Sequence, residues 1–195
     1  MIGIQQFENI KQNHGSYASW AVWADGLEKS KSKMGDISHF KNESVLGLLK
    51  NNIVMVGLNL SRSKPASEPF LNFHDPSSRA NDFKIRYAFK DSPYYGAYMT
   101  DIIKSLVEVE ARNVMRCLKE HPETIKKNLM TFREEMKDLK ATAPVILAFG
   151  RDSFTLLSEN LNRNEYSKLI RLTHYSCRIS KEDYKETVFK EIESQ

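Results

Sequence analysis

Three polar residues with catalytic potential follow or interrupt separate apolar stretches of the chain. Asn59 comes after the apolar run at 53–56 and Gly57, Asp101 lies within the stretch 98–103, and His174 follows the stretch 169–172. An amide can hold a water molecule or bind a base edge without carrying charge, and a histidine can stabilise negative charge on a leaving group. The set suits cleavage of an N-glycosidic bond, with Phe73 or Phe70 as the ring that stacks on the base.

The motifs of several common catalytic sites are absent from the sequence. It contains no GxxxxGK[ST] or GxGxxG loop for nucleotides, no GxSxG and no HExxH. The two cysteines, Cys117 and Cys177, lack CxxC spacing, and no histidines and acids cluster in a metal-binding pattern. We therefore expect no metal, no iron–sulfur cluster and no other cofactor.

Apolar runs alternate with helical patterns along the chain. Strands are expected at 53–56, 98–103, 145–149 and 169–172, and helices at 40–50, from Asn81, from Pro122, near Asp152 and after Ser180. This alternation predicts an α/β protein, a three-layer α/β/α domain with a four-stranded, mainly parallel sheet, spanning 1–195. Because parallel strands end at one edge, we expect Asn59, Asp101, Gly150 and His174 to converge there.

The first forty residues are rich in aromatic side chains. Tyr17, Trp20 and Trp23 fall at helical three-residue spacing, which predicts a helical or looped extension packed on the core. His14, by contrast, is expected at the surface or at the start of a helix.

Charge and hydropathy bound the class of protein. The chain of 195 residues is 41% hydrophobic and 28% charged, and no apolar run approaches the roughly 20 residues that span a bilayer. The N-terminus lacks a secretion signal, so we expect a reduced, cytoplasmic protein without membrane contact, as a monomer. Five basic residues and one acid lie between 162 and 181, which suits a nucleic-acid phosphate backbone or, equally, an ordinary solvated surface.

Four segments, in order, resemble the uracil-DNA glycosylase superfamily. Residues 57–61 (GLNLS) resemble the Gly-Ile-Asn-Pro-Gly motif of the mismatch-specific branch, and 70–89 resemble its Phe-x-His-Pro-x-x-Asn-Arg-Phe segment. Residues 98–104 resemble the Thr-Asn-Val-Val-Lys strand of the iron–sulfur branch, and 174–176 stand where the family has His-Pro-Ser. The likeness runs from about residue 50 to 180.

The resemblance implies a monofunctional glycosylase that flips a deaminated or damaged base out of DNA. It assigns water positioning to Asn59, stabilisation of the leaving base to His174, and stacking to Phe73. The implied base-binding residues also include Gly57, Leu58, Asp101 and Ser176, and the implied DNA contacts are Arg171, Arg178 and Lys181.

The chain departs from the family at several positions. Leu60 and Tyr175 replace prolines, which rigidify a loop by fixing φ, and Arg178 falls near the position where several relatives intercalate a leucine. Asp101 replaces an asparagine that offers both a donor and an acceptor, whereas an ionised carboxylate only accepts. Asp101 therefore either faces the pocket, where uracil needs it protonated by burial, or points away and caps a loop.

These departures leave two other functions open. One is a catalytically inactive protein that retains the fold and binds nucleic acid or a nucleobase. The other is a site for a small molecule or a free nucleotide in the same cleft.

Overall fold

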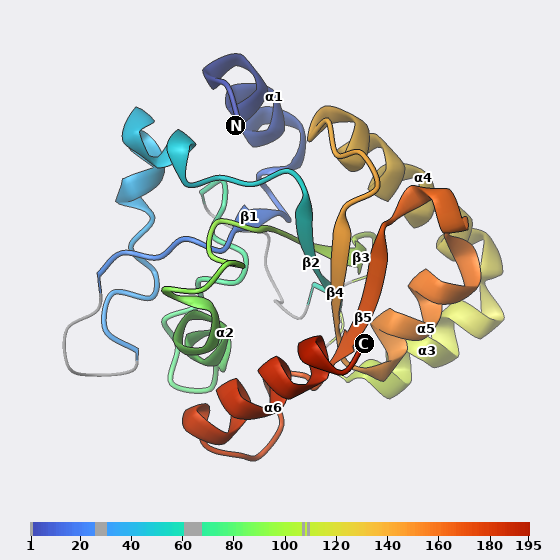
Figure 1. Ribbon diagram of the computed structural model, residues 1–195. Coiled ribbons are helices and arrows are strands. Elements are labelled where there is room, and N and C mark those ends of the chain that lie inside the picture. The colour runs from blue at the N-terminus through green and yellow to red at the C-terminus, as the bar shows by residue number, and fades with distance from the viewer. Residues whose placement is uncertain (1, 26–30, 61–67, 107, 109) are drawn as a thin grey trace.

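The computed structural model describes residues 2–25, 31–60, 68–106, 108 and 110–195. A five-stranded sheet runs through its centre in the order β1-β3-β2-β4-β5 (Figure 1). The strands are β1 (Ser19–Trp20), β2 (Ile53–Asn59), β3 (Tyr98–Ile103), β4 (Val145–Phe149) and β5 (Lys168–Leu172). The last four are parallel to one another, as the buried apolar runs of β2 and β4 predict, whereas β1 pairs antiparallel with β3.

Helices cover both faces of the sheet, so the predicted α/β/α layers are confirmed (Figure 1). One face packs against α3, α4 and α5, with α1 lying on α4, and the other packs against α2 and α6. The helices are α1 (Ile4–His14), α2 (Asp82–Phe89), α3 (Ala111–Glu120), α4 (Pro122–Asp138), α5 (Arg151–Asn160) and α6 (Lys181–Glu193).

The prediction of four strands was wrong by one. Ser19 and Trp20 form a strand of only two residues, too short for any alternation of apolar and polar positions to show in the sequence. The spacing of Tyr17, Trp20 and Trp23 does not place them on one helix, because α1 ends at His14. Trp20 and Trp23 are nonetheless core residues, 0% and 3% exposed.

Other expected elements differ in detail. The helix expected over 40–50 is two short 3-10 helices, Ser38–Lys41 and Glu43–Gly47. The strand expected over 53–56 continues through Gly57 to Asn59. Helix α3 was not predicted, and α1 lies within the helical or looped extension expected over the first forty residues. Helix α6 begins after Ser180 as expected, and the Ser180 side chain caps it by accepting from the Asp183 amide.

Candidate functional site

Two adjoining cavities open at the carboxyl edge of the parallel strands and form one cleft. They measure about 320 and 410 Å³, and both are lined by Asn59, Asp101, His174, Tyr175 and Ser176. The predicted convergence of strand ends therefore occurs. We call the cavity that Phe73 and Asn72 also line the first arm, and the cavity that reaches the start of α5 the second arm.

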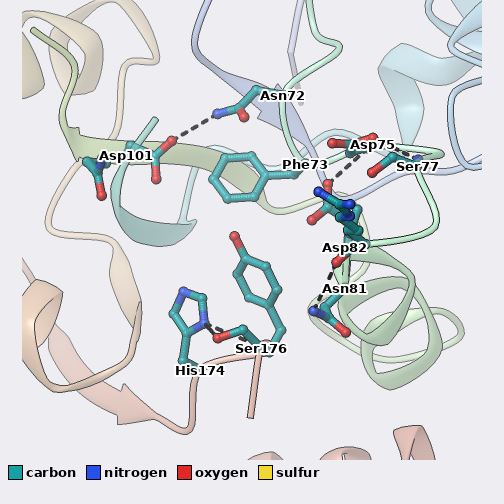
Figure 2. A pocket seen from close by; sticks show the side chains of 13 residues that line it. Asn72, Phe73, Asp75, Ser77, Asn81, Asp82, Asp101, His174 and Ser176 are labelled. Atoms are coloured by element: carbon teal, nitrogen blue, oxygen red, sulfur yellow. Dashed lines mark hydrogen bonds between the residues drawn. The ribbon is translucent and has the colours of Figure 1, made fainter. Parts of the chain in front are cut away.

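Figure 2 shows the side chains around the first arm. Asp101 and Asn72 lie together on one side, His174 and Ser176 lie on the opposite side, and the ring of Phe73 stands between them. Phe70, the other candidate for stacking, is 1% exposed and packs against Phe7, so it belongs to the core.

Gly57 lies directly beneath the Asp101 carboxyl group. The two residues are partners in the parallel ladder of β2 and β3. A Cβ atom on Gly57 would lie 2.2 Å from Asp101 Oδ1 and 3.6 Å from the Phe73 ring. The absence of a side chain at residue 57 is therefore what admits the carboxyl group to the cleft.

Asp101 is a buried acid rather than a loop cap. It is 4% exposed, and its Oδ2 accepts a hydrogen bond of 3.0 Å from Asn72 Nδ2. Burial raises the pKa of Asp101 to about 7, against the lowering effects of the Asn72 hydrogen bond and the Lys104 ammonium. The carboxyl group therefore titrates well above the range of an exposed aspartate.

The amide of Asn59 is oriented by backbone carbonyls. Its Nδ2 donates to the oxygens of Leu60 at 3.0 Å and Glu108 at 2.7 Å, with a longer contact of 3.4 Å to Leu106. Carbonyl oxygens only accept, so the nitrogen must face them. The group that Asn59 can offer to the cleft is its acceptor oxygen, Oδ1.

The imidazole of His174 is held as one neutral tautomer. The Ser176 backbone N–H, which can only donate, lies 3.1 Å from His174 Nδ1, and the Ser176 hydroxyl lies 2.8 Å from the same atom. Nδ1 is therefore an acceptor and the proton is on Nε2. Burial lowers the pKa of His174 to about 4, so at neutral pH the ring carries an N–H donor without a charge.

The tight turn at Gly150 packs against this imidazole. Gly150 has φ of 90°, and a Cβ there would lie 3.5 Å from the His174 Cβ and Cδ2 atoms. The Tyr175 ring stacks on the His174 ring, with centroids 4.3 Å apart and planes at 24°. The histidine is fixed by packing as well as by hydrogen bonds.

The loop that carries Phe73 is strained and is tied to the N-terminal segment. Phe70 and Phe73 have φ of 68° and 63°, a left-handed conformation that residues with a side chain rarely adopt. The hydrogen bonds that hold the loop include Phe70 N–H to Gly15 O, Ser19 Oγ to Phe70 O, and Trp23 Nε1 to Phe73 O. The aromatic N-terminal segment therefore shapes the cleft wall.

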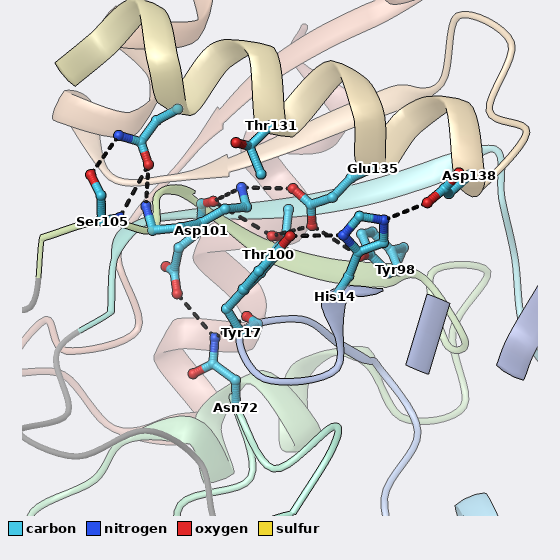
Figure 3. Close-up of polar contacts among 12 residues, drawn as sticks. His14, Tyr17, Asn72, Tyr98, Thr100, Asp101, Ser105, Thr131, Glu135 and Asp138 are labelled. Carbon is cyan, nitrogen blue, oxygen red and sulfur yellow. Dashed lines mark hydrogen bonds and ion pairs between the residues drawn. The ribbon is translucent and has the colours of Figure 1, made fainter. Parts of the chain in front are cut away.

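A buried ion pair supports the end of β3 from the other face of the sheet (Figure 3). Lys104 Nζ lies 2.6 Å from Glu135 Oε2 and donates to the Asp101 backbone oxygen at 2.5 Å. Glu135 is 0% exposed, and its Oε1 accepts from Tyr98 and Thr100 at 2.9 and 2.8 Å. This network fixes the backbone from which the Asp101 side chain projects.

His14 was expected at the surface or at the start of a helix, and both expectations are wrong: it is the last residue of α1 and belongs to a neighbouring buried polar group. It is 5% exposed, and its ring nitrogens lie 2.7 Å from the Tyr17 hydroxyl and 2.8 Å from Asp138 (Figure 3). The Tyr17 backbone oxygen accepts from Asn72 at 2.7 Å. The N-terminal segment and the Asp101 carboxyl group are thus joined through one amide.

The predicted site residues divide into two groups. Asn59, Phe73, Asp101, His174, Ser176 and Leu58 line the cleft, and Gly57 lies beneath it. The expected DNA contacts Arg171, Arg178 and Lys181 do not line either arm, whereas Arg79 and Arg151 do. Lys181 pairs with Glu182 and lies over the Tyr87 ring. Ser61, the last residue of the first motif, lies outside the described residues.

Asn72 and Tyr175 are among the cleft residues that were not predicted from the sequence. Asn72 stands between Phe70 and Phe73, the two candidates for the stacking ring, and neither that expectation nor the family motif assigns it a role. Tyr175 was noted only as the loss of a proline. Each of them is a polar or aromatic residue directly beside a predicted site residue, and that position is the feature of the sequence that indicates it.

No family model, curated protein or solved structure matches the chain. Among the described residues, no group of three or more His, Cys, Asp or Glu side chains is arranged to hold a metal ion. In the same part of the chain, no helix has both the length and the apolar character needed to cross a membrane.

Proposed function

We propose that the protein is a monofunctional DNA-base glycosylase that removes a deaminated or damaged base by N-glycosidic hydrolysis. The observation that carries this proposal is the convergence of Asn59, Phe73, Asp101 and His174 on one cleft from four separate segments. A base flipped into the first arm would meet an aromatic ring, a hydrogen-bonding carboxyl group and a neutral N–H donor. These are the groups that such a reaction requires.

His174 carries the electrostatic part of this mechanism. As the bond between the base and sugar C1′ breaks, its electron pair moves onto the base, which becomes anionic. The Nε2 proton donates to an oxygen of the leaving base and stabilises that charge. A neutral imidazole suits this role, because it forms no ion pair with the anionic base that would have to break when the base departs.

Asn59 positions the attacking water in this mechanism. Its Oδ1 accepts a hydrogen bond from a water molecule, whose oxygen then bonds to C1′. The water's proton passes to solvent or to the departing base, and the products are a free base and an abasic sugar. Because backbone carbonyls fix the amide, the water is positioned without a conformational search.

DNA is the partner in this proposal, met by a single copy of the chain in the cytoplasm. Arg79 and Arg151 at the cleft and Arg171, Arg178 and Lys181 outside it would contact phosphates. Phe73 is only 3% exposed, so stacking of a base on its ring requires the first arm to widen.

The buried position of Phe73 favours a second candidate, a catalytically inactive protein that binds nucleic acid or a nucleobase. Oligonucleotides carrying one uracil, hypoxanthine or xanthine, single- and double-stranded, separate the two. Abasic product that is lost in Asn59→Ala supports the enzyme. Salt-dependent binding by folded protein without any product supports the binder and refutes the enzyme.

A further inference from the structure

Asp101 and Asn72 form a fixed pair of hydrogen-bonding groups on one side of the first arm (Figure 2). Both N–H groups of Asn72 are committed, one to the Tyr17 carbonyl and one to Asp101 Oδ2. Because a backbone carbonyl only accepts, the orientation of this amide is unambiguous. What Asn72 can offer a bound molecule is its acceptor oxygen.

Asp101 completes the pair with an oxygen whose role depends on protonation. Its Oδ2 accepts from Asn72, and its Oδ1 lies over Gly57, where a residue with a side chain would exclude it. When neutral, the carboxyl group places its proton on Oδ1 and donates. When ionised, it only accepts, and the cleft then presents two acceptors and no donor.

A donor beside an acceptor matches one type of base edge. Uracil, hypoxanthine and xanthine share a lactam edge, an N–H next to a C=O. The N–H fits the Asn72 oxygen and the C=O fits a protonated Asp101. Cytosine and adenine present the reverse pattern, a ring nitrogen that accepts next to an amine that donates, so a fixed pair that matches one class opposes the other.

We propose that Asp101, held by Asn72 over Gly57, determines which base the cleft accepts, and that lactam bases bind with the carboxyl group protonated. The substrate class rests on the proposed glycosylase function, whereas binding of the free base does not.

The charged groups facing Asp101 come from each element packed around it. Lys104, directly after β3, favours the ionised form, while Glu135 of α4 and Asp82 of α2 favour the neutral form. His174, across the cleft, is neutral above its pKa of about 4. Together with burial, these groups give Asp101 a pKa of about 7. Proton uptake on base binding is therefore expected at pH values where binding can be measured.

The test is binding of free uracil, hypoxanthine, cytosine and adenine to the full chain by calorimetry, from about pH 5.5 to about 8.5. For the wild type we expect lactam bases to bind more tightly than cytosine and adenine. Their affinity should be constant below about pH 7 and fall about tenfold per pH unit above it. Repeating the titration in buffers of different ionisation enthalpy should show uptake of about one proton per base bound at the upper end.

Two variants make the result specific. Asp101→Asn keeps a donor and an acceptor without a titrating group, so its binding should persist and lose the pH dependence. Glu159→Gln removes the same charge from an exposed position on α5 and should keep the wild-type profile. Any of four results would overturn the proposal. The wild type could bind uracil and cytosine equally tightly, or its affinity for lactam bases could be independent of pH. Asp101→Asn could keep the wild-type dependence of affinity on pH, or the wild type could bind no base at all.

These outcomes are distinct from failure of the proposed function. Selective, pH-dependent binding of lactam bases without abasic product from any oligonucleotide would refute the glycosylase and leave this inference standing. Abasic product that forms with the same pH dependence in wild type and Asp101→Asn would support the glycosylase and refute this inference.

Discussion

Replacing Asp101 with asparagine should stabilise the protein, by an amount that grows with pH. The side chain is 4% exposed and keeps its shape in the variant, which retains an oxygen to accept from Asn72. The carboxyl group has a pKa of about 7 in the folded state and an ordinary value of 3.8. A gap of about three pH units corresponds to about 4 kcal/mol, an upper bound because local relaxation reduces it.

The sign follows from proton binding. Between about pH 4 and about pH 7 the unfolded chain has lost the Asp101 proton while the folded protein retains it. The free energy of unfolding of the wild type therefore falls, relative to the asparagine variant, as pH rises through this window. Above about pH 7 the difference should be constant.

Urea denaturation of both proteins at several pH values measures this difference, with the fluorescence of the buried Trp20 and Trp23 as the signal. All other titrating groups are shared, so to first order their contributions cancel when the two curves are subtracted. A difference that stays the same between about pH 4.5 and pH 8, or that favours the wild type at high pH, would refute the buried, neutral carboxyl group.

Three further predictions concern the surroundings of this site. Gly57→Ala should displace the Asp101 carboxyl group, lower the free energy of unfolding by about 1–3 kcal/mol in urea denaturation, and abolish base binding. An unchanged base affinity would show that the cleft tolerates the methyl group. Lys104→Met should cost about 3–5 kcal/mol because it leaves the Glu135 carboxylate buried without its partner, and adding Glu135→Gln should recover part of that loss; additive costs would argue against the pair. If the chain is a glycosylase, His174 should contribute no change in rate between about pH 5 and 6.5, since its pKa is about 4; single-turnover rates of wild type and His174→Gln that diverge through this range would contradict a neutral imidazole.

The arrangement of strands was largely predictable from the sequence. Continuous apolar runs such as Val145–Phe149 are what a parallel strand buried on both faces requires, and the glycine and polar residues after them mark the cleft edge. The convergence of Asn59, Asp101 and His174 followed from that topology, because parallel strands end on one side.

What could not be predicted depends on contacts distant in sequence. The two-residue strand β1 exists because β3 offers it an edge, and no local pattern encodes such pairing. The clamp from Asn72 to Asp101 spans 29 residues, and the pair of His14 with Asp138 spans 124. The strained backbone at Phe73 is likewise imposed by the N-terminal segment that holds its carbonyl.

The central claim is that this cleft hydrolyses the N-glycosidic bond of a deaminated base. The most direct measurement is release of free base from oligonucleotides carrying a single uracil, hypoxanthine or xanthine, with wild type, Asn59→Ala and His174→Gln assayed side by side. The account predicts an abasic product from wild type, and rates lower by at least about a hundredfold in each variant. Folded wild-type protein that binds these oligonucleotides but releases no base from any of them would contradict it.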